Sequence, residues 1–532
     1  MPAQAVVLGG GVAGATCALE LSALTPPDTP LTVTLIDPQP IIKACTLVAK
    51  LTRSALDLAI SDVDAAEWSR ARGIVFVQDR AVAVRDGQVR CQSGAVFRFS
   101  ACCIATGAAP FSPHALRAAG DSVLTLRDTC SVDSLKRKLA GARRAVVVGA
   151  GGIAMELVHE IARCHIVWVM KGTHVGSPFF DKRAAEQLSN VFGLGQLSCE
   201  SLGDSLPENR DVTGSGSSAS PLSAQSTIAS SASSNETEKG RNIDAFGAGV
   251  GPEWVSRRFQ PVLFDKKGKI EIQQPSKYTE LEGRSTNSQK IVRIAKECEI
   301  LRVTKDDAGV WPIVAHLSDG SMVGADVILV GTGVLPNVNW LRGSGIEIDQ
   351  GFASKREASL SGCPGGILVS AENMSTNVRG LFAAGDCTTV RLDTVGADWI
   401  QMRLWSQAQT AGRACAQSMA RYLQGEPAAC LGLDFDVFAH ATQFFNKKVV
   451  LLGRYNAQGV KDDYRMVESG GERGDDHYIR VVLVNGRVRG AILVGEVDKA
   501  ETFENLILDG LDVSQLEAEL VDPSIDLEDY FD

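Results

Sequence analysis

Two glycine-rich segments of the chain have the spacing of a loop that binds nucleotide phosphates. The first fits the pattern G-x-G-x-x-G and lies between an apolar run, residues 5–8, and a helical pattern. In such a loop the first glycine permits a tight turn, the second lets a pyrophosphate approach the backbone, and the third lets helix and strand pack closely. The helix N-terminus then offers free N–H groups and a partial positive charge to the phosphates. We therefore predict a dinucleotide site at Gly9, Gly11, Val12, Ala13 and Gly14.

Asp37 ends the next predicted strand, residues 32–37, which follows this helical pattern. An acid at the end of the second strand is placed to accept hydrogen bonds from the adenosine ribose of a bound dinucleotide. Strand, glycine turn, helix and terminal acid together predict a dinucleotide-binding unit at the N-terminus.

The second glycine segment fits the related pattern G-x-G-x-x-A and again follows an apolar run, residues 145–148. Because strand, turn and helix recur in the same order, this segment predicts a second dinucleotide-binding unit. The residues expected to contact its nucleotide are Gly149, Gly151, Gly152, Ile153 and Ala154.

Lys171 stands where the second unit lacks an acid. Its second predicted strand, residues 166–170, ends on Met170 and Lys171. An acid there would favour NAD and repel a 2′-phosphate, whereas Lys171 could neutralise that phosphate. A solvated surface lysine is the other interpretation. The sequence therefore permits NADPH and leaves the choice of nucleotide open.

Further segments at the ends of apolar runs are typical of flavoproteins rather than of simple dehydrogenases. The residues concerned are Ala105, Thr106, Gly107, Gly333, Gly385 and Asp386. These segments and the two glycine loops follow one another in an order that resembles that of the pyridine nucleotide–disulfide oxidoreductase superfamily. The resemblance implies FAD in the first unit and NAD(P)H in the second. It also implies that these segments return to the flavin, with Asp386 on its ribityl–phosphate part.

The same resemblance implies roles for two charged residues and one helix. Lys43 stands where many members have a lysine beside flavin N5, and Glu156 matches the glutamate that pairs with it. Two unrelated surface charges are the alternative. Residues 398–405 lead into a helical pattern whose N-terminus, with Gln401 and Trp405, is expected at the N1–C2=O edge of the flavin.

The cysteines depart from the dithiol members of the superfamily. The chain has 13 cysteines but no closely spaced pair at the positions where those members carry their redox disulfide. Cys45 stands alone after the second strand, where single-cysteine oxidases and peroxidases place theirs, although an inert thiol is the simpler interpretation. Cys102 and Cys103 are adjacent in a predicted strand and should point to opposite faces, so they are poorly placed to bridge. No metal site is predicted.

Several longer segments resemble a eukaryotic family of flavoproteins within this superfamily that lacks the redox disulfide. The matching stretches include IIKACT, QMRLWSQAQTAG, FFNKKVVLLGRYNAQG and IDLEDYFD. That resemblance implies NAD(P)H-dependent flavin reduction and residence in the nucleus and cytoplasm. It further implies association with a tRNA ligase complex, whose metal-containing active site the flavoprotein would protect from oxidation.

The expected activity is therefore hydride transfer from NAD(P)H to FAD, with the cofactors supplying the chemistry and the protein supplying position and electrostatics. Two alternatives stay open at this point. One is a single-cysteine NADH oxidase or peroxidase that uses Cys45. The other is an NAD(P)H-sensing binding protein with little turnover.

The elements that position these residues predict an α/β fold with three domains, in keeping with 532 residues. Two are Rossmann-like dinucleotide-binding domains: a discontinuous FAD domain, residues 1–125 and 335–428, and an inserted NAD(P)H domain, residues 126–334. The second contains a predicted long insert, about residues 176–310, with a serine-rich, disordered stretch at 211–240. Residues 429–532 predict an α+β domain with an acidic tail.

The net charge and hydropathy of the chain exclude two classes of partner. A net charge of −10 argues against direct binding to a nucleic-acid backbone, because phosphate contacts need a basic surface. No uncharged apolar run is long enough to predict a membrane span, and no signal peptide is predicted.

Overall fold

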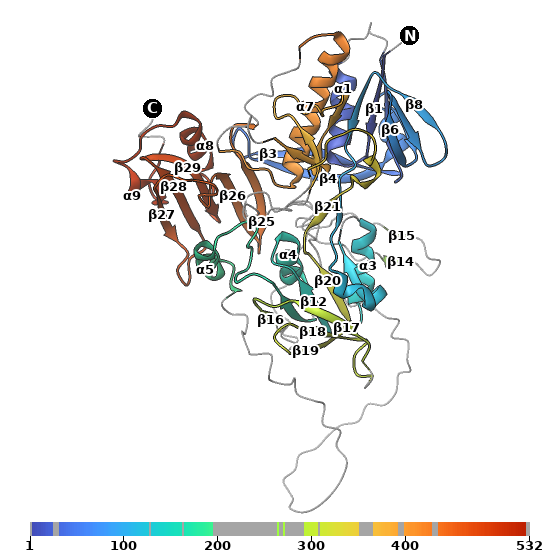
Figure 1. Cartoon of the computed structure of the whole chain (residues 1–532). Coiled ribbons are helices and arrows are strands. Elements are labelled where there is room, and N and C mark those ends of the chain that lie inside the picture. Colours follow the sequence, from blue (N-terminus) through green and yellow to red (C-terminus); the bar gives the residue numbers. More distant parts are fainter. Residues whose placement is uncertain are drawn as a thin grey trace, which may run out of the picture.

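The computed structural model places three units around a common junction, and Figure 1 shows each of them in its own colours. The first, blue and orange, lies at the top; the second, cyan to yellow-green, lies below it; the third, red, lies at the left. The structure describes residues 3–24, 31–126, 129–161, 164–194, 263–264, 270–271, 292–306, 309–349, 365–391, 398–427 and 435–527.

The first unit is built on a parallel sheet with helices packed against it. Its strands, in the order in which they lie in the sheet, are β23 (Leu381–Ala383), β9 (Ala101–Ile104), β1 (Ala3–Leu8), β2 (Leu31–Asp37) and β5 (Val75–Gln78). The apolar runs of β1 and β9 are buried, as expected for parallel strands covered on both faces. Helices α1 (Val12–Leu24) and α7 (Trp405–Gln424) pack so closely that a Cβ at Gly412 would lie only 2.3 Å from the carbonyl oxygen of Ala13. Glycine at this position permits the contact.

Smaller elements decorate this unit. They are the antiparallel ribbon β3 (Ile41–Lys50) and β4 (Leu56–Asp64), the helix α2 (Ala65–Arg70), the meander β6 (Ala81–Arg85), β7 (Gln88–Cys91) and β8 (Val96–Arg98), and the pair β22 (Ile367–Val369) and β24 (Thr388–Val390).

The second unit repeats the design of the first. Its parallel sheet has the order β11 (Val123–Thr125), β20 (Val327–Val330), β12 (Arg144–Val148), β13 (His165–Val169) and β16 (Val292–Ala295). Helices α3 (Thr129–Leu139), α4 (Gly152–Glu160) and α5 (Lys182–Val191) accompany it, with the antiparallel strands β17 (Ile300–Thr304), β18 (Ile313–Leu317) and β19 (Met322–Ala325) and the short pair β14 (Leu263–Phe264) and β15 (Ile270–Glu271).

Two predicted boundaries are corrected by the strand pairing. Strand β11 was expected in the first domain, but it pairs with β20 of the second, and Leu116 of the preceding 3₁₀ helix (His114–Ser122) is buried in that unit's core. The chain crosses between the units in the ribbon of β10 (Ala108–Pro110) and β21 (Val334–Pro336). The predicted insert, 176–310, is also too wide, because α5, β16 and β17 fall within it and belong to the second unit. The serine-rich segment 211–240 lies outside the described residues.

The third unit is an antiparallel sheet with two helices, as the C-terminal pattern predicted. The strand order is β25 (Ala439–Phe444), β26 (Lys447–Gly453), β29 (Arg487–Val494), β28 (Tyr478–Val484) and β27 (Tyr464–Gly470). Helices α8 (Ala500–Asp509) and α9 (Glu517–Val521) complete it. The acidic tail is described as far as residue 527.

Buried polar contacts hold the third unit against the other two. The fully buried guanidinium of Arg480 donates to Asp181, the N-cap of α5, at 2.6 Å, and to Glu468 of its own sheet at 2.6 Å. Glu504 on α8 is also buried, and it accepts a hydrogen bond from the backbone amide of Ser54, between β3 and β4, at 3.0 Å. Removing one partner of such a buried pair is costly, so these contacts fix the junction of the three units.

Neither a membrane-crossing helix nor a metal centre is found in the part of the chain that the structure describes. No described helix is long and apolar enough to cross a membrane. No group of three or more His, Cys, Asp or Glu side chains among the described residues is arranged to hold a metal ion.

Candidate functional site

The first glycine loop has the backbone geometry that the pattern predicts. Gly9 has a φ of +113°, and a Cβ there would lie 2.2 Å from the carbonyl oxygen of Ala105. A Cβ at Gly14 would lie 1.9 Å from the carbonyl oxygen of Gly9. No atom lies within 4 Å of a Cβ placed on Gly11, directly before α1. Gly9 and Gly14 are therefore needed for packing, whereas Gly11 leaves open space where a pyrophosphate is expected. The residues fit the phosphates of FAD.

Asp37 is held at the end of β2 beside this loop. One carboxylate oxygen accepts the amide of Gly10 at 2.6 Å, and the other accepts the amide of Gln39 at 2.7 Å. The aspartate thus braces the glycine loop and lies at the strand end from which a ribose is expected to be bound.

The segment Ala105–Thr106–Gly107 is joined to the return crossing from the second unit. The hydroxyl of Thr106 donates to the carbonyl oxygen of Asn337 at 2.9 Å, and the side-chain amide of Asn337 donates back to the carbonyl of Thr106 at 3.0 Å. Gly333, with a φ of +94°, accepts a hydrogen bond from the amide of Phe111 at 2.9 Å. The two crossings are therefore fastened to each other next to α1.

Gly385 and Asp386 reach the same place from β23. Gly385 has a φ of +76°, and a Cβ there would lie 2.8 Å from the Cβ of Ala13 on α1, so glycine permits this close approach. Arg403 donates to the carbonyl of Asp386 at 2.9 Å. Gln401 is held by the backbone of β24, and Trp405 begins α7.

The second glycine loop repeats the first. Gly149 has a φ of +120°, and a Cβ there would lie 2.2 Å from the carbonyl oxygen of Gly331. Ala154 replaces the third glycine and is buried, with its Cβ 3.4 Å from the position that a Cβ on Gly331 would occupy. Around Gly151, the N-cap of α4, the nearest atom to an added Cβ is Pro178 Cγ at 3.7 Å. The space beside Gly151 fits a second pyrophosphate.

Lys171 lies on the surface after β13. Its side chain is 84% exposed and its ammonium forms an ion pair with Glu299 at 2.5 Å. An exposed pair of this kind contributes little stability and is easily replaced by another anion. A role for Lys171 at a 2′-phosphate stays a prediction.

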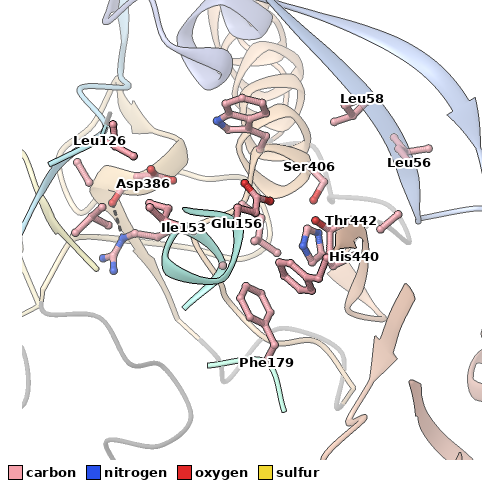
Figure 2. A pocket seen from close by; sticks show the side chains of 18 of the residues that line it. Leu56, Leu58, Leu126, Ile153, Glu156, Phe179, Asp386, Ser406, His440 and Thr442 are labelled. Carbon is pink, nitrogen blue, oxygen red and sulfur yellow. Dashed lines mark hydrogen bonds between the residues drawn. The ribbon is translucent and has the colours of Figure 1, made fainter. Parts of the chain in front are cut away.

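All three units contribute walls to a cavity of about 230 Å³ (Figure 2). Leucines of β4, the β10–β21 ribbon, Asp386 and the start of α7 line it from the first unit, α4 from the second, and β25 from the third. Its lining residues are Leu56, Leu58, Ala108, Pro110, Leu126, Gly152, Ile153, Glu156, Phe179, Val334, Asp386, Arg403, Leu404, Trp405, Ser406, His440, Ala441, Thr442 and Phe444. A mostly apolar cavity with a few converging polar groups is the usual form of a cofactor or substrate site.

Glu156 lies in this cavity, but it does not pair with Lys43 as predicted. Glu156 is only 7% exposed and stands on α4. The ammonium of Lys43 instead forms an ion pair with Asp62 at 3.1 Å. The reason is local, because Lys43 and Asp62 are directly opposite each other in the β3–β4 ribbon. The predicted ion pair between Lys43 and Glu156 is therefore replaced by the pair of Lys43 with Asp62. The roles of Lys43 and Glu156 in catalysis stay predictions.

Lys43→Met tests the predicted role at the flavin. If Lys43 helps to stabilise charge on the reduced flavin, the variant should bind FAD normally and be reduced by NAD(P)H at least about tenfold more slowly. Glu156→Gln should have a smaller effect in the same direction. Asp62→Asn is the matched control, since it removes the partner that Lys43 has in the ribbon. Rapid-mixing absorbance of the flavin measures all three, and wild-type rates in Lys43→Met would remove this residue from the site.

His440 of β25 contributes a half-buried imidazole to the cavity. Its ring stacks on that of Phe179, with centroids 6.2 Å apart and planes 20° apart. Burial lowers the pKa of His440 to about 4, so the imidazole is neutral at physiological pH. Its Nδ1 is buried and has no hydrogen-bond partner among the described residues. An unpaired buried nitrogen costs about 1–3 kcal/mol, which points to a group that enters the cavity and pairs with it.

The low pKa of His440 predicts how stability depends on pH. The unfolded chain takes up the proton near the usual value of about 6.5, whereas the folded chain resists it until about 4. Stability from this residue is therefore complete above about pH 6.5 and is lost as the pH falls towards 4. The thermal unfolding midpoint should drop less over this range in His440→Phe than in the wild type. Parallel pH curves for the two proteins would show that His440 titrates normally.

No disulfide is found among the cysteines whose side chains the structure describes, and none of these cysteines lines the cavity. Cys45 lies on β3 opposite Ile60 and packs partly against the core of the first unit. Cys102 and Cys103 are both buried in β9 and form no disulfide in this structure. Cys387, next to Asp386, is fully buried, and burial raises the pKa of its thiol to about 12. Such a thiol is a poor nucleophile.

Sequence reasoning missed much of the aromatic wall of the cavity. Phe179 and Phe444 each approach within 3.4 Å of the position that a Cβ on Gly152 would occupy. They come from a turn before α5 and from the end of β25, and neither lies in a recognisable motif. His440 also lies outside any recognisable motif, and its signal in the sequence is a lone histidine in an apolar stretch.

A family model matches more than half of the chain, and relatives cover 99% of it. A family model described as pyridine nucleotide-disulphide oxidoreductase matches residues 3–193 and 284–414. A mouse protein, pyridine nucleotide-disulfide oxidoreductase domain-containing protein 1, is 33% identical over 537 residues, 99% of this chain and 98% of its own length. The Dictyostelium discoideum protein of the same name is 32% identical over 575 residues, covering 99% of each chain.

The fold also matches that of a solved structure. The covalent putidaredoxin reductase–putidaredoxin complex contains a chain that superposes with a TM-score of 0.62 at 16% identity, covering 99% of this chain and 98% of that one. The likeness extends over all three units and supports the arrangement of two dinucleotide-binding units and a C-terminal unit.

Proposed function

Because this chain belongs to the pyridine nucleotide-disulphide oxidoreductase family, we propose that it passes electrons from NAD(P)H to FAD without a redox-active disulfide and thereby protects a tRNA ligase partner from oxidation. The broader part of this statement follows from the family itself. The chain is an FAD-dependent NAD(P)H oxidoreductase.

The cavity at the junction of the three units is the observation that carries the proposed mechanism. When bound, NAD(P)H supplies a hydride and FAD accepts it. The chain would hold the dinucleotides at Gly11 and Gly151, where an added Cβ meets either no atom within 4 Å or only Pro178 Cγ at 3.7 Å. Apolar side chains such as Leu56 and Phe179 exclude water from the cavity between them. Glu156 and Asp386 contribute carboxylates to the lining and would orient the two cofactors.

The absence of a catalytic disulfide is supported by the positions of the thiols. The cavity lining contains no cysteine among the described residues, and the described thiols form no disulfide. Electrons would then leave the flavin for an external acceptor rather than for a dithiol of the chain.

Cys45→Ser tests whether a single thiol takes part. We expect the variant to keep the wild-type rates of flavin reduction by NAD(P)H and of reoxidation by air, because Cys45 lies on β3 and does not line the cavity. Cys91→Ser, in the meander of the same unit, is the matched control. Loss of a peroxide reductase activity that the wild type possesses would establish the single-cysteine mechanism instead.

The tRNA ligase part of the proposal rests on the resemblance of the β3, α7 and C-terminal segments to the eukaryotic family without the disulfide. The same resemblance implies residence in the nucleus and cytoplasm, which is part of this proposal. Recombinant tRNA ligase should keep its activity in air when this chain and NAD(P)H are both present, and lose it when either is left out. The Gly151→Val variant is the control, since it should bind FAD without being reduced. If Gly151→Val protected the ligase as well as the wild type does, protection would not depend on flavin reduction. That result would refute the proposal.

A further inference from the structure

His440 occupies a defined place between the third unit and the nucleotide-binding helix of the second. Its ring stacks on Phe179, which in turn lies against Gly152, the first residue of α4. Glu156, one turn further along α4, lines the same cavity. In the view of Figure 2, Glu156 lies between His440 and Asp386 of the first unit, and all three line the cavity.

The imidazole of His440 has a nitrogen to which a ligand could hydrogen bond. Its buried Nδ1 lacks a partner among the described residues, although buried polar atoms are nearly always paired in folded proteins. The neighbours of His440 on the α4 side belong to the unit that binds the pyridine nucleotide. A carboxamide offers both a donor and an acceptor, so it can pair with either tautomer of a neutral imidazole.

We propose that His440 is a positioning residue that hydrogen bonds to the carboxamide of the nicotinamide ring. This inference rests on the proposed function, because it requires that NAD(P)H enter the cavity along α4. The bond would orient the nicotinamide ring against the aromatic wall of Phe179 and Phe444. The third unit would then be part of the pyridine nucleotide site. Its His440 would orient the nicotinamide ring, whereas the glycine loops would bind only the pyrophosphates.

The test compares two ligands that differ only in the nicotinamide part. A tetrahydronicotinamide analogue of NADH keeps the carboxamide but donates no hydride, and ADP-ribose lacks the ring. Calorimetric titration of the FAD-loaded protein gives both affinities, each also measured with the 2′-phosphorylated form. His440→Phe keeps an aromatic ring and loses both nitrogens, so it should weaken the analogue about fivefold to tenfold and leave ADP-ribose unchanged. His440→Gln, which restores a donor and an acceptor, should recover most of the loss.

The outcomes separate failure of this inference from failure of the proposed function. Unchanged affinity for the analogue in His440→Phe, or equal weakening of both ligands, would overturn the role of His440. A wild-type protein that binds neither ligand would overturn the proposed function itself. Nitrogen NMR of ¹⁵N-histidine-labelled wild type gives a test that does not depend on the folding of His440→Phe. The ring resonance of His440 is assigned by its loss in His440→Gln. It should shift when the analogue is added and not when ADP-ribose is added. No shift with the analogue would contradict the proposal.

Discussion

Replacing Gly11 with valine should give a folded protein that has lost its yellow colour. The Cβ of the new side chain meets no protein atom within 4 Å, so the substitution leaves the fold intact. The same side chain fills the space through which the FAD pyrophosphate must approach the backbone before α1. FAD content measured by absorbance after denaturation should fall below about one tenth of an equivalent per chain. The apo variant should also unfold at a lower temperature, because bound ligand stabilises the folded state.

Gly141→Val is the matched control for this experiment. Gly141 lies between α3 and β12, also has no atom within 4 Å of an added Cβ, and belongs to neither glycine loop. It should keep one FAD per chain. A yellow Gly11→Val protein with full FAD content would show that the first glycine loop does not hold the flavin cofactor.

Gly151→Val should leave the yellow FAD in place and abolish its reduction by NAD(P)H. The nearest atom to an added Cβ is Pro178 Cγ at 3.7 Å, an ordinary contact, so the second unit can accept the side chain. The valine then blocks the pyrophosphate of the pyridine nucleotide at the N-terminus of α4. Loss of the bound nucleotide removes the oriented donor, and we expect flavin reduction to slow by at least about a hundredfold.

Dithionite provides the internal control for Gly151→Val. It reduces FAD without using the nucleotide site, so the variant should still be bleached by dithionite at the wild-type extent. Release of FAD from Gly151→Val would instead show that the assignment of the two units is wrong, since damage to the second loop should not reach the first.

The glycine loops could be predicted because their chemistry is local. A Cβ added to Gly9 or to Gly149 would lie 2.2 Å from a backbone carbonyl oxygen of a neighbouring turn. The same steric limit therefore requires glycine at the same place in both motifs. Asp37 is likewise determined by its place at the end of β2. Such positions depend on a few neighbouring residues and on backbone conformation, both of which leave a clear trace in the sequence.

The partner of Lys43 could not be predicted in this way. Its neighbour Asp62 is set by the register of the β3–β4 ribbon, which contains an irregularity near Leu47 and Ala49. A pattern of residue types does not specify such a register, so the family resemblance suggested Glu156 instead. The aromatic wall was missed for a related reason, because Phe179 and Phe444 meet only when the second and third units are docked. The boundary before Val123 likewise became visible only in the pairing of β11 with β20.

Counting electrons shows whether NAD(P)H reduces FAD in this chain without a redox-active disulfide. Anaerobic titration of the purified protein with dithionite, and then with NADH or NADPH, gives the number of reducing equivalents needed to bleach the flavin completely. We expect full bleaching after about two electrons per FAD, with at least one of the two nucleotides as effective as dithionite. A requirement of about four electrons, which would reveal a dithiol, or failure of both nucleotides to bleach the flavin, would contradict this expectation.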